Sequence, residues 1–353
     1  MRLALQQANI TLGNTKSNPA VGCVIVKNDC LISAGSTGVK GRPHAEVNAI
    51  NSSKKNVKNS NLYVTLEPCS HYGKTPPCVK KIIKKKIKKV FFSIKDPDER
   101  SSNKSSKQFK VNAIKVSIGI NSNKIKNFYK SYILYKRQKL PFVTCKLAVS
   151  KDFFTIDKKN KWITNQYSRS RAHLMRARHD CIITSSNTVI ADNPHLTCRI
   201  NGLESLSPSR IILDKRLRIS VKSNILKNNY KYKTYIFYNI INKKKLKSLK
   251  DLGIKLCKIP VDSKGNLNLI KVLNKAKELG FSRIFLETGI KLSTSFLKKN
   301  LVNDLKIFVS DKKINKNGLG NIRKYFKLFL KDKKGIVEKI NLFGDKLLSY
   351  EIK

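Results

Sequence analysis

Three residues in the first quarter of the chain have the types and the spacing of a zinc site. His44, Cys69 and Cys78 supply one imidazole and two thiolates. A set of three protein ligands leaves a fourth position for water, as in catalytic rather than structural zinc sites. Glu46 follows two residues after the histidine. Because a zinc-bound water ionises near neutral pH, a carboxylate beside it can pass a proton to a departing amine. The pattern predicts hydrolytic removal of an amino group from a ring.

The flanking residues predict elements that would bring these ligands together. Residues 62–66 form an apolar run typical of a buried strand, which would deliver Cys69 to a loop. The proline before Cys78 favours a helix that starts there and extends to about Lys89, with its dipole favouring a thiolate. Another proline predicts a helix opening at His44. We expect these two helix N-termini to converge on one metal; the simpler alternative is reduced core cysteines and a surface histidine.

The residues around these ligands resemble one enzyme family. Residues 18–22, 43–47 and the long run 63–78 are similar to the bifunctional deaminase–reductases of riboflavin biosynthesis. In deaminases of the same superfamily that act on nucleosides or nucleic acids, the two cysteines lie close together as Pro-Cys-x-x-Cys. Here residues 70–77 separate them, and this inserted loop is the discriminating feature of the match.

The resemblance implies the fold and the contacts of the first part of the chain. Residues 1–140 would form a three-layer α/β/α domain of the cytidine-deaminase type, with a single zinc ion and Glu46 as its catalytic residue. Asn18, His71 and Lys74 would contact the substrate. That substrate would be a small molecule, a pyrimidine ribotide.

Length and cysteine content limit the possible classes of protein. A chain of 353 residues is too long for one ordinary core and suggests two domains. Eight cysteines without a secretory segment indicate a reducing compartment, so we expect a cytoplasmic location. No apolar run approaches the roughly 18 residues that a membrane span needs, so no membrane partner is expected.

The formal charge of +52 is compatible with a nucleic-acid partner, because lysine and arginine neutralise phosphates. However, the lysines are spread over both halves, and asparagine and isoleucine are over-used with them, which favours a biased base composition of the gene. Runs such as 84–86 and 243–245 lack interleaved aromatic residues. We therefore expect no nucleic-acid partner, and keep a zinc-dependent nucleic-acid base deaminase as the alternative function.

A domain boundary is expected near residue 140, where Pro141 starts a new pattern. Before it, we expect a loop at 100–107, an edge strand at 111–120 and a helix at 121–138. Side chains of this helix expected to turn inward are Ile125, Phe128, Tyr132 and Leu134. After the boundary, strands alternate with helical stretches, which predicts an α/β sheet. The expected strands are 142–148, 181–184, 210–213, 234–238, 283–286 and 305–309.

Two places in the second half could hold a dinucleotide, although the fingerprint Gly-x-Gly-x-x-Gly is absent from it. An expected strand at 284–287 is followed by Thr288 and Gly289, and then by a helix from about Lys291. Glycine lets a backbone approach closely, and a helix N-terminus offers free amides to a pyrophosphate. The strand at 182–186 likewise ends in small polar residues. Ordinary turns are the simpler interpretation of both places.

The second half also resembles the reductase domain of the same family. Residues 146–148, 161–164, 188–194 and 196–199 match its motifs in order. The match implies that residues 141–353 form a dihydrofolate-reductase-like α/β domain that uses NADPH. The implied nucleotide contacts are Ala148, Trp162, Thr188, Asp192, Gly289, Ile290, Lys291, Leu292, Ser293, Thr294 and Ser295. The implied substrate contacts are Lys146, Asn160, Arg176, Leu196, Arg199 and Glu287.

Chemistry agrees with the implied role of the arginines, because a guanidinium can bind the phosphate of a sugar through two hydrogen bonds. In so basic a chain, Arg176 and Arg199 could instead be surface residues, and Trp162, the only tryptophan, could be a packing residue. The chain departs from the family at 96–101, where a glycine-rich turn is missing, and at 150–153, where a Ser-Leu-Asp-Gly turn is usual.

We therefore predict a two-domain enzyme of riboflavin synthesis. Its first domain would use zinc to deaminate a diaminopyrimidinone ribotide by hydrolysis. Its second domain would use NADPH to open the ribosyl group and reduce it to ribityl. A deaminase whose reductase domain is inactive is the second alternative, and a homo-oligomer is compatible with the sequence.

Overall fold

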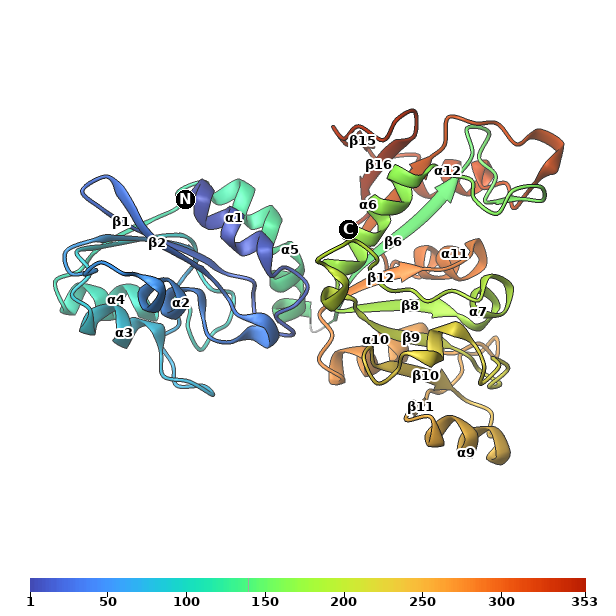
Figure 1. The fold of residues 1–353 in the computed structure, drawn as a ribbon, viewed down its shortest axis with the longest axis horizontal. Coiled ribbons are helices and arrows are strands. Elements are labelled where there is room, and N and C mark those ends of the chain that lie inside the picture. The colour runs from blue at the N-terminus through green and yellow to red at the C-terminus, as the bar shows by residue number, and fades with distance from the viewer. Residues whose placement is uncertain (139) are drawn as a thin grey trace. The chain divides into compact units, whose positions relative to one another are not determined.

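The computed structural model describes residues 1–138 and 140–353. The chain divides into two compact units, Met1–Leu140 and Pro141–Lys353 (Figure 1). Each unit has its own β-sheet with helices packed against it. Within the residues described, no helix is both long enough and apolar enough to cross a membrane.

The sheet of the first unit combines an antiparallel hairpin with parallel strands. From one edge to the other, its strands are β2 (Cys30–Ser36), β1 (Gly22–Lys27), β3 (Asn61–Leu66), β4 (Lys89–Ile94) and β5 (Lys115–Ile118). Strand β1 runs antiparallel to β2 and β3, whereas β3, β4 and β5 are parallel. Parallel neighbouring strands need crossover connections. The loops that follow β3 and β4 therefore leave the sheet at the same end of the strands.

Helices cover both faces of this sheet and produce three layers (Figure 1). On one face lie α1 (Arg2–Ile10) and α5 (Ser122–Gln138), and on the other lie α2 (Ala45–Ser52), α3 (Cys78–Lys84) and α4 (Lys104–Val111). A short 3-10 helix, η1 (Val39–Gly41), precedes α2. The core between the layers includes the buried side chains of Ile25, Leu62, Val64, Ile82 and Phe92. The predicted three-layer fold of this part of the chain is confirmed.

Helix α1 packs very close to the sheet at Gly22, the first residue of β1. A Cβ atom at Gly22 would lie 1.8 Å from the carbonyl oxygen of Ala4 in α1. The helix side of this contact is also made of small residues, because Ala4 and Ala8 are its buried positions. Glycine is therefore required here by the space between two backbones.

Two helices of the first unit differ from the sequence-based expectation. Helix α3 ends at Lys84, earlier than predicted, because Lys86 adopts a φ of 54° and the chain turns to bury Ile87 before β4. Residues 104–111 form α4, where a loop and the start of a strand were predicted. Phe109 of this helix is fully buried, so the packing of this side chain overrides the weak helix propensity of residues 104–111.

The last two elements of this unit follow the prediction more closely. Strand β5 is an edge strand as expected, although it is shorter than the predicted segment. In α5, Ile125 and Tyr132 are buried as predicted. Tyr129, which was not expected in the core, is also buried, and its hydroxyl lies 2.6 Å from Thr65 Oγ1. A polar group inside a core needs such a partner, and the hydrogen bond supplies it.

The sheet of the second unit is parallel except at one edge. From edge to edge, its strands are β11 (Lys255–Lys258), β10 (Thr234–Tyr238), β9 (Ser209–Leu213), β8 (Cys181–Ser185), β12 (Arg283–Glu287), β6 (Phe142–Val149), β13 (Asp304–Val309), β16 (Lys346–Glu351) and β15 (Ile336–Val337). Strand β16 runs antiparallel to both of its neighbours, β13 and β15, whereas the other described strand pairs of this sheet are parallel. All strands predicted for this half are present, whereas β11, β15 and β16 were not predicted.

The remaining elements connect these strands. The helices are α6 (Gln166–Ala177), α7 (Ser186–Asp192), α8 (Asn224–Lys227), α9 (Lys243–Asp251), α10 (Leu269–Glu278), α11 (Ile290–Lys298) and α12 (Arg323–Leu330). Short elements are β7 (Ile156–Asp157), which pairs with β14 (Gly318–Leu319), η2 (Glu204–Leu206) and η3 (Asn315–Asn317). Because β12 lies between the earlier strands β8 and β6, the carboxyl ends of these three strands are neighbours. Parallel sheets bind ligands at such a point.

Gly22→Ala should destabilise the first unit, because the added Cβ overlaps the backbone of α1 and one of the two must move. We expect a loss of about 1–3 kcal/mol in the free energy of unfolding, as at other overpacked sites. Urea denaturation followed by circular dichroism measures it. Gly73→Ala is the matched control, since its Cβ would meet no atom closer than 3.9 Å. Equal stability of the two variants would contradict the close contact.

Candidate active sites

The predicted zinc ligands lie together beyond the carboxyl end of β3 in the first sheet. His44 is the residue before α2, Cys69 lies in the loop that follows β3, and Cys78 is the first residue of α3. The Nδ1 atom of His44 lies 3.5 Å from Cys69 Sγ and 3.3 Å from Cys78 Sγ. Within residues 1–138 and 140–353, these three form the one group of at least three candidate metal-binding side chains, with ligand atoms within 4.8 Å of one another.

This geometry fits a zinc ion. Tetrahedral zinc with the usual zinc–nitrogen and zinc–sulfur bond lengths holds its ligand atoms about 3.5 Å apart. The two nitrogen–sulfur distances, 3.5 and 3.3 Å, have this size. One nitrogen and two sulfurs also match the donor preference of zinc. The three residues therefore leave space for a small ion between them without rearrangement of the backbone.

Cys69 and Cys78 shift each other's pKa in opposite directions. The thiol of Cys78 hydrogen-bonds to Cys69, and this contact, with a further contribution from His44, lowers the pKa of Cys69 to about 4. The same contact, together with burial, raises the pKa of Cys78. The backbone N–H of Cys78 also donates to Cys69 Sγ, over 3.3 Å. The start of α3 thus stabilises a thiolate on Cys69, whereas the sequence predicted the effect for Cys78 itself.

Glu46 lies in the first turn of α2 and is only 4% exposed. Burial raises the pKa of its carboxyl to about 7, although the nearby His44 opposes the shift. A carboxyl group that titrates near neutral pH can both accept and return a proton. Its position beside the three ligands is the one that the sequence predicted.

The three residues implied to contact the deaminase substrate all lie in loops of the first unit. Asn18 donates its amide to the carbonyl of Gly41 over 2.9 Å. His71 pairs through Nδ1 with the hydroxyl of Ser101 at 2.8 Å. Lys74 is exposed in the loop between the two cysteines. Asn18 and His71 are thus held by neighbours, whereas Lys74 is positioned by its loop.

Glu67 is a further buried residue of this site, for which no role was predicted. It directly precedes the Pro68–Cys69 pair and is 3% exposed. Its carboxylate accepts hydrogen bonds from the backbone N–H groups of Asp96 (3.2 Å), Asn103 (3.2 Å) and Ser105 (3.3 Å), and from the Ser105 hydroxyl (2.7 Å). It therefore ties the cysteine loop to residues 96–105. The signal in the sequence was an acidic residue at the end of an apolar strand.

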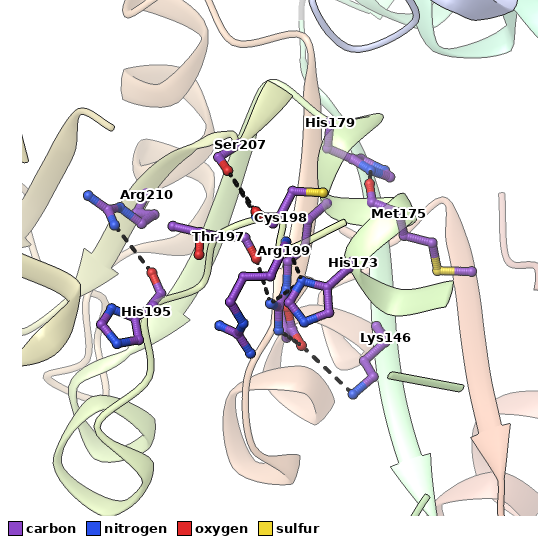
Figure 2. A network of polar contacts seen from close by, with 12 residues as sticks. Lys146, His173, Met175, His179, His195, Thr197, Cys198, Arg199, Ser207 and Arg210 are labelled. Carbon is purple, nitrogen blue, oxygen red and sulfur yellow. Dashed lines mark hydrogen bonds and ion pairs between the residues drawn. The ribbon is translucent and has the colours of Figure 1, made fainter. Parts of the chain in front are cut away.

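In the second unit, a buried cluster of charged side chains lies near the carboxyl ends of β6 and β12. Arg176 of α6 forms two hydrogen bonds with Glu287, at 2.8 and 3.0 Å. Nζ of Lys146, on β6, lies 3.8 Å from the same carboxylate. A dashed line from Lys146 marks this ion pair in Figure 2. Burial alone would raise the pKa of Glu287, but Arg176 and Lys146 lower it to about 2. Glu287 is thus ionised and holds both cations in place.

The segment with Leu196 and Arg199 lies against this cluster. Nη1 of Arg176 donates to the carbonyl of Thr197 over 2.9 Å. Leu196 is buried with a φ of 51°, and the side chain of Arg199 is exposed. Asn160 is exposed and donates to Asp157 over 2.8 Å. Arg176, Leu196 and Arg199 are therefore close in space, whereas no such contact links Asn160 to them in the described hydrogen bonds.

The two places expected to hold a dinucleotide lie next to each other. The end of β8 and the end of β12 are adjacent, because these strands pair in parallel. Thr188 of α7 connects them: its hydroxyl lies 3.0 Å from Ser185 Oγ and 3.3 Å from Thr288 Oγ1, and it accepts the N–H of Gly289 over 3.3 Å. The starts of α7 and α11 therefore lie side by side, and backbone amides at both can face one pyrophosphate.

The other implied nucleotide contacts lie on several elements around this place. Ala148 is half-buried in β6, and Asp192 is exposed at the end of α7. Trp162 is 56% exposed and lies under the guanidinium of Arg169, at 5.1 Å from the ring centroid, so it is not a core packing residue.

The residues of α11 divide between two faces of that helix. Exposed or half-buried side chains are those of Ile290, Lys291, Leu292 and Ser295. Ser293 and Thr294 are buried against the unit's own core, so any contact that they make with a nucleotide comes from their backbone. The helix start, with Gly289 before it, is the accessible part of the segment.

Comparison with known proteins identifies related chains for both units. Residues 1–94 match the family model of the cytidine and deoxycytidylate deaminase zinc-binding region, and residues 141–314 match that of the RibD C-terminal domain. The riboflavin biosynthesis protein RibD of Aquifex aeolicus is 35% identical over 314 residues, which are 88% of this chain and 86% of that protein. RibD of Bacillus amyloliquefaciens is 35% identical over 311 residues, 87% of this chain and 82% of that protein.

Solved structures agree with these relatives. RibD of Acinetobacter baumannii superimposes with a TM-score of 0.85 at 30% identity, covering 100% of this chain and 97% of that one. The diaminohydroxyphosphoribosylaminopyrimidine deaminase/5-amino-6-(5-phosphoribosylamino)uracil reductase of Thermotoga maritima superimposes with a TM-score of 0.84 at 29% identity, with the same coverage. The predicted fold class, family and pair of activities are thereby confirmed. The chain belongs to the RibD family of riboflavin biosynthesis proteins, and it is a bifunctional enzyme with a zinc-binding deaminase region and a reductase domain.

Proposed function

We propose that residues 1–140 deaminate a phosphoribosylated diaminopyrimidinone and that residues 141–353 reduce the ribosyl group of the product with NADPH. The convergence of His44 Nδ1, Cys69 Sγ and Cys78 Sγ at zinc-like distances is the observation that carries the first half of this proposal. A related chain from Thermotoga maritima has both activities in its name. The charged cluster and the paired helix starts of the second unit support the second half.

In the deaminase site, we assign a single zinc ion to His44, Cys69 and Cys78. When bound, zinc lowers the pKa of water and so supplies a nucleophile at neutral pH. Glu46 takes a proton from the attacking water and returns it to the leaving amino group, so that water is consumed and ammonia released. Its burial beside the ligands supports this role. Asn18 and His71 would orient the pyrimidine, and Lys74 would reach the ribotide from the inserted loop.

In the reductase site, Arg176 and Arg199 would bind the phosphate of the ribotide, and Lys146 would lie near the ring-opened sugar. Glu287 keeps Arg176 and Lys146 in position through the contacts described above. NADPH would place its pyrophosphate at the starts of α7 and α11, with Trp162, Ala148 and Asp192 along its length. In a cofactor enzyme of this kind, the protein contributes orientation and electrostatics, and the cofactor supplies the hydride.

The altered turn at 150–153 does not by itself argue for an inactive reductase domain. The hydroxyl of Ser150 donates to Asp152 over 2.6 Å and accepts the N–H of Phe154 over 2.9 Å. Asp152 in turn accepts the N–H groups of Ile314 (3.1 Å) and Asn315 (2.8 Å). The segment is therefore an ordered turn after β6, although its sequence departs from the family.

One assay tests the whole proposal: purified protein, the ribotide, zinc and NADPH, with the products identified by mass. Release of ammonia without NADPH oxidation would mean that only the deaminase is active. The alternative with an inactive reductase domain would then be supported. Deamination of RNA instead of the ribotide would favour the nucleic-acid alternative. Oligomeric state and cytoplasmic location stay predictions from the sequence.

Glu46→Gln should reduce ammonia release by about 100-fold or more, because glutamine cannot transfer the proton. The amide keeps the size of the carboxyl group, so zinc content should stay at the wild-type level by metal analysis. Reduction of a chemically prepared deaminated ribotide serves as the control for folding of the second unit. A variant that releases ammonia at the normal rate would refute the role of Glu46.

Cys78→Ala should remove zinc from the purified protein, because two protein ligands hold the ion far less tightly than three. Inductively coupled plasma analysis measures the metal content per chain. His71→Ala is the control, since His71 bonds to Ser101 and is not assigned to the metal. Loss of zinc in the His71 variant together with its retention in the Cys78 variant would overturn the ligand assignment.

Gly289→Val should weaken NADPH binding about tenfold or more, because branched methyl groups would block approach to the helix start. The fold should tolerate valine: Gly289 has a φ of −68°, and an added Cβ meets no atom within 4 Å. Fluorescence titration gives the Kd for NADPH, and the melting temperature checks the fold. Gly289→Ala should have a smaller effect. Unchanged binding by the valine variant would exclude this helix start from the site.

A further inference from the structure

His173 lies at the centre of the reductase substrate site but has no role in the proposals above. It lies on α6, three residues before Arg176. Its Nδ1 atom accepts the backbone N–H of Arg199 over 3.0 Å and lies 3.4 Å from Nη1 of Arg176. In Figure 2, the imidazole ring lies between the side chains of Arg199 and Lys146. One ring nitrogen therefore contacts both arginines assigned to the phosphate.

These contacts determine the protonation of the ring. Two N–H donors point at Nδ1, and a nitrogen that accepts hydrogen bonds carries no proton, so the proton of the neutral ring is on Nε2. Burial, followed by the charges of Arg176 and Arg199, lowers the pKa of His173 to about 4. Glu287, on β12, opposes this shift. The ring is therefore a neutral acceptor at neutral pH.

The hydrogen bond to His173 is one of a regular set that holds the segment before and including Arg199. Arg210, which is fully buried in β9, donates to the carbonyl of His195 over 3.2 Å. Arg176 donates to the carbonyl of Thr197 over 2.9 Å, and His173 accepts the N–H of Arg199. The backbone groups of residues 195, 197 and 199 are thus hydrogen-bonded to side chains of β9 and α6. Of these three hydrogen bonds, the one to His173 is nearest to the Arg199 side chain.

We propose that His173 is a positioning residue of the reductase: its ring fixes the backbone of Arg199, so that the guanidinium groups of Arg199 and Arg176 face the phosphorylated sugar together. This inference rests on the proposed function, because it needs Arg199 to contact substrate. The side chain of Arg199 is exposed, so its backbone must be held if the guanidinium is to be pre-organised. Binding then requires less ordering of a long side chain.

A cationic histidine that contacts the phosphate directly is the competing role for His173. Protonation would place a hydrogen on Nδ1, directly opposite the N–H of Arg199 and beside the charge of Arg176. Both contacts would then be repulsive. Lys146, on β6, adds another positive charge to the same site. The geometry thus favours the neutral, positioning role over the cationic one.

Two substitutions separate the acceptor at Nδ1 from the rest of the ring. Asparagine places its Oδ1 atom one bond beyond Cγ, as histidine places Nδ1, whereas the polar atoms of glutamine lie one bond farther out. His173→Asn should therefore keep the bond to Arg199, and His173→Gln should lose it. We expect the glutamine variant to raise the KM for the deaminated ribotide about tenfold with kcat little changed, and the asparagine variant to stay within about threefold of wild type.

NADPH oxidation is the measurement, and ammonia release by the same preparations is the internal control, since the deaminase site lies in the other unit. The ratio of the KM values of wild type and His173→Asn should be constant between about pH 6 and 8, because a neutral ring does not titrate there. A ratio that changes as the pH falls would support the cationic role and overturn the proposal.

A double-mutant cycle separates this inference from the proposed function. Arg199→Ala should raise the KM about tenfold or more, and His173→Gln in that background should add less than about threefold, because the two residues act together. If Arg199→Ala leaves the KM unchanged, the assignment of Arg199 to the phosphate fails and the inference fails with it. If Arg199→Ala raises the KM but His173→Gln does not, or if their effects multiply, the inference alone is overturned.

Discussion

Both sites depend on the same structural constraint: a parallel strand ends, the chain turns, and the first backbone amides of a helix point back at the place where the strand ended. In the first unit, the loop after β3 carries Cys69, and the N–H of Cys78 at the start of α3 donates to its sulfur. In the second unit, β8 and β12 end beside each other and lead into α7 and α11. Backbone amides at helix starts favour negative charge, which is a thiolate in the first unit and, in the proposed function, a pyrophosphate in the second. The connections between strands, rather than the strands themselves, therefore supply the binding groups.

The residues that hold these connections in place are harder to predict from the sequence than the residues assigned to the chemistry. The candidate zinc ligands and Glu46 could be proposed from the sequence because the helix starts and the strand end next to them are local patterns. Glu67 could not be assigned a role, because its hydrogen-bond partners lie at Asp96, Asn103 and Ser105, far along the chain. The same holds for His173, whose partner Arg199 is on a different segment. Long-range polar contacts have no periodicity that a single sequence can reveal.

Fold prediction succeeded and failed for related reasons. Strands of the second unit were predicted well because they are continuous apolar runs, as expected of buried parallel strands. Helix α4 was missed because its residues are mostly polar and Phe109 is its only buried apolar side chain. The order of the strands was not predictable at all. The insertion of β12 between β8 and β6 is what places two weak candidate dinucleotide sites next to each other. The family resemblance indicated the residues, but only the topology explains why they lie together.

The hydroxyl groups of Ser185, Thr188 and Thr288 have a further consequence for the proposed pyrophosphate site. Thr188 accepts the N–H of Gly289, and either partner can donate in its contacts with Ser185 and Thr288. A hydroxyl changes its donor direction by rotation about one C–O bond. The trio can therefore turn its hydrogens outward toward an incoming negative group and inward again when that group leaves, while every Cα atom stays where it is. These three hydroxyl groups can therefore adapt to the charge of a ligand by rotation alone, without movement of the backbone.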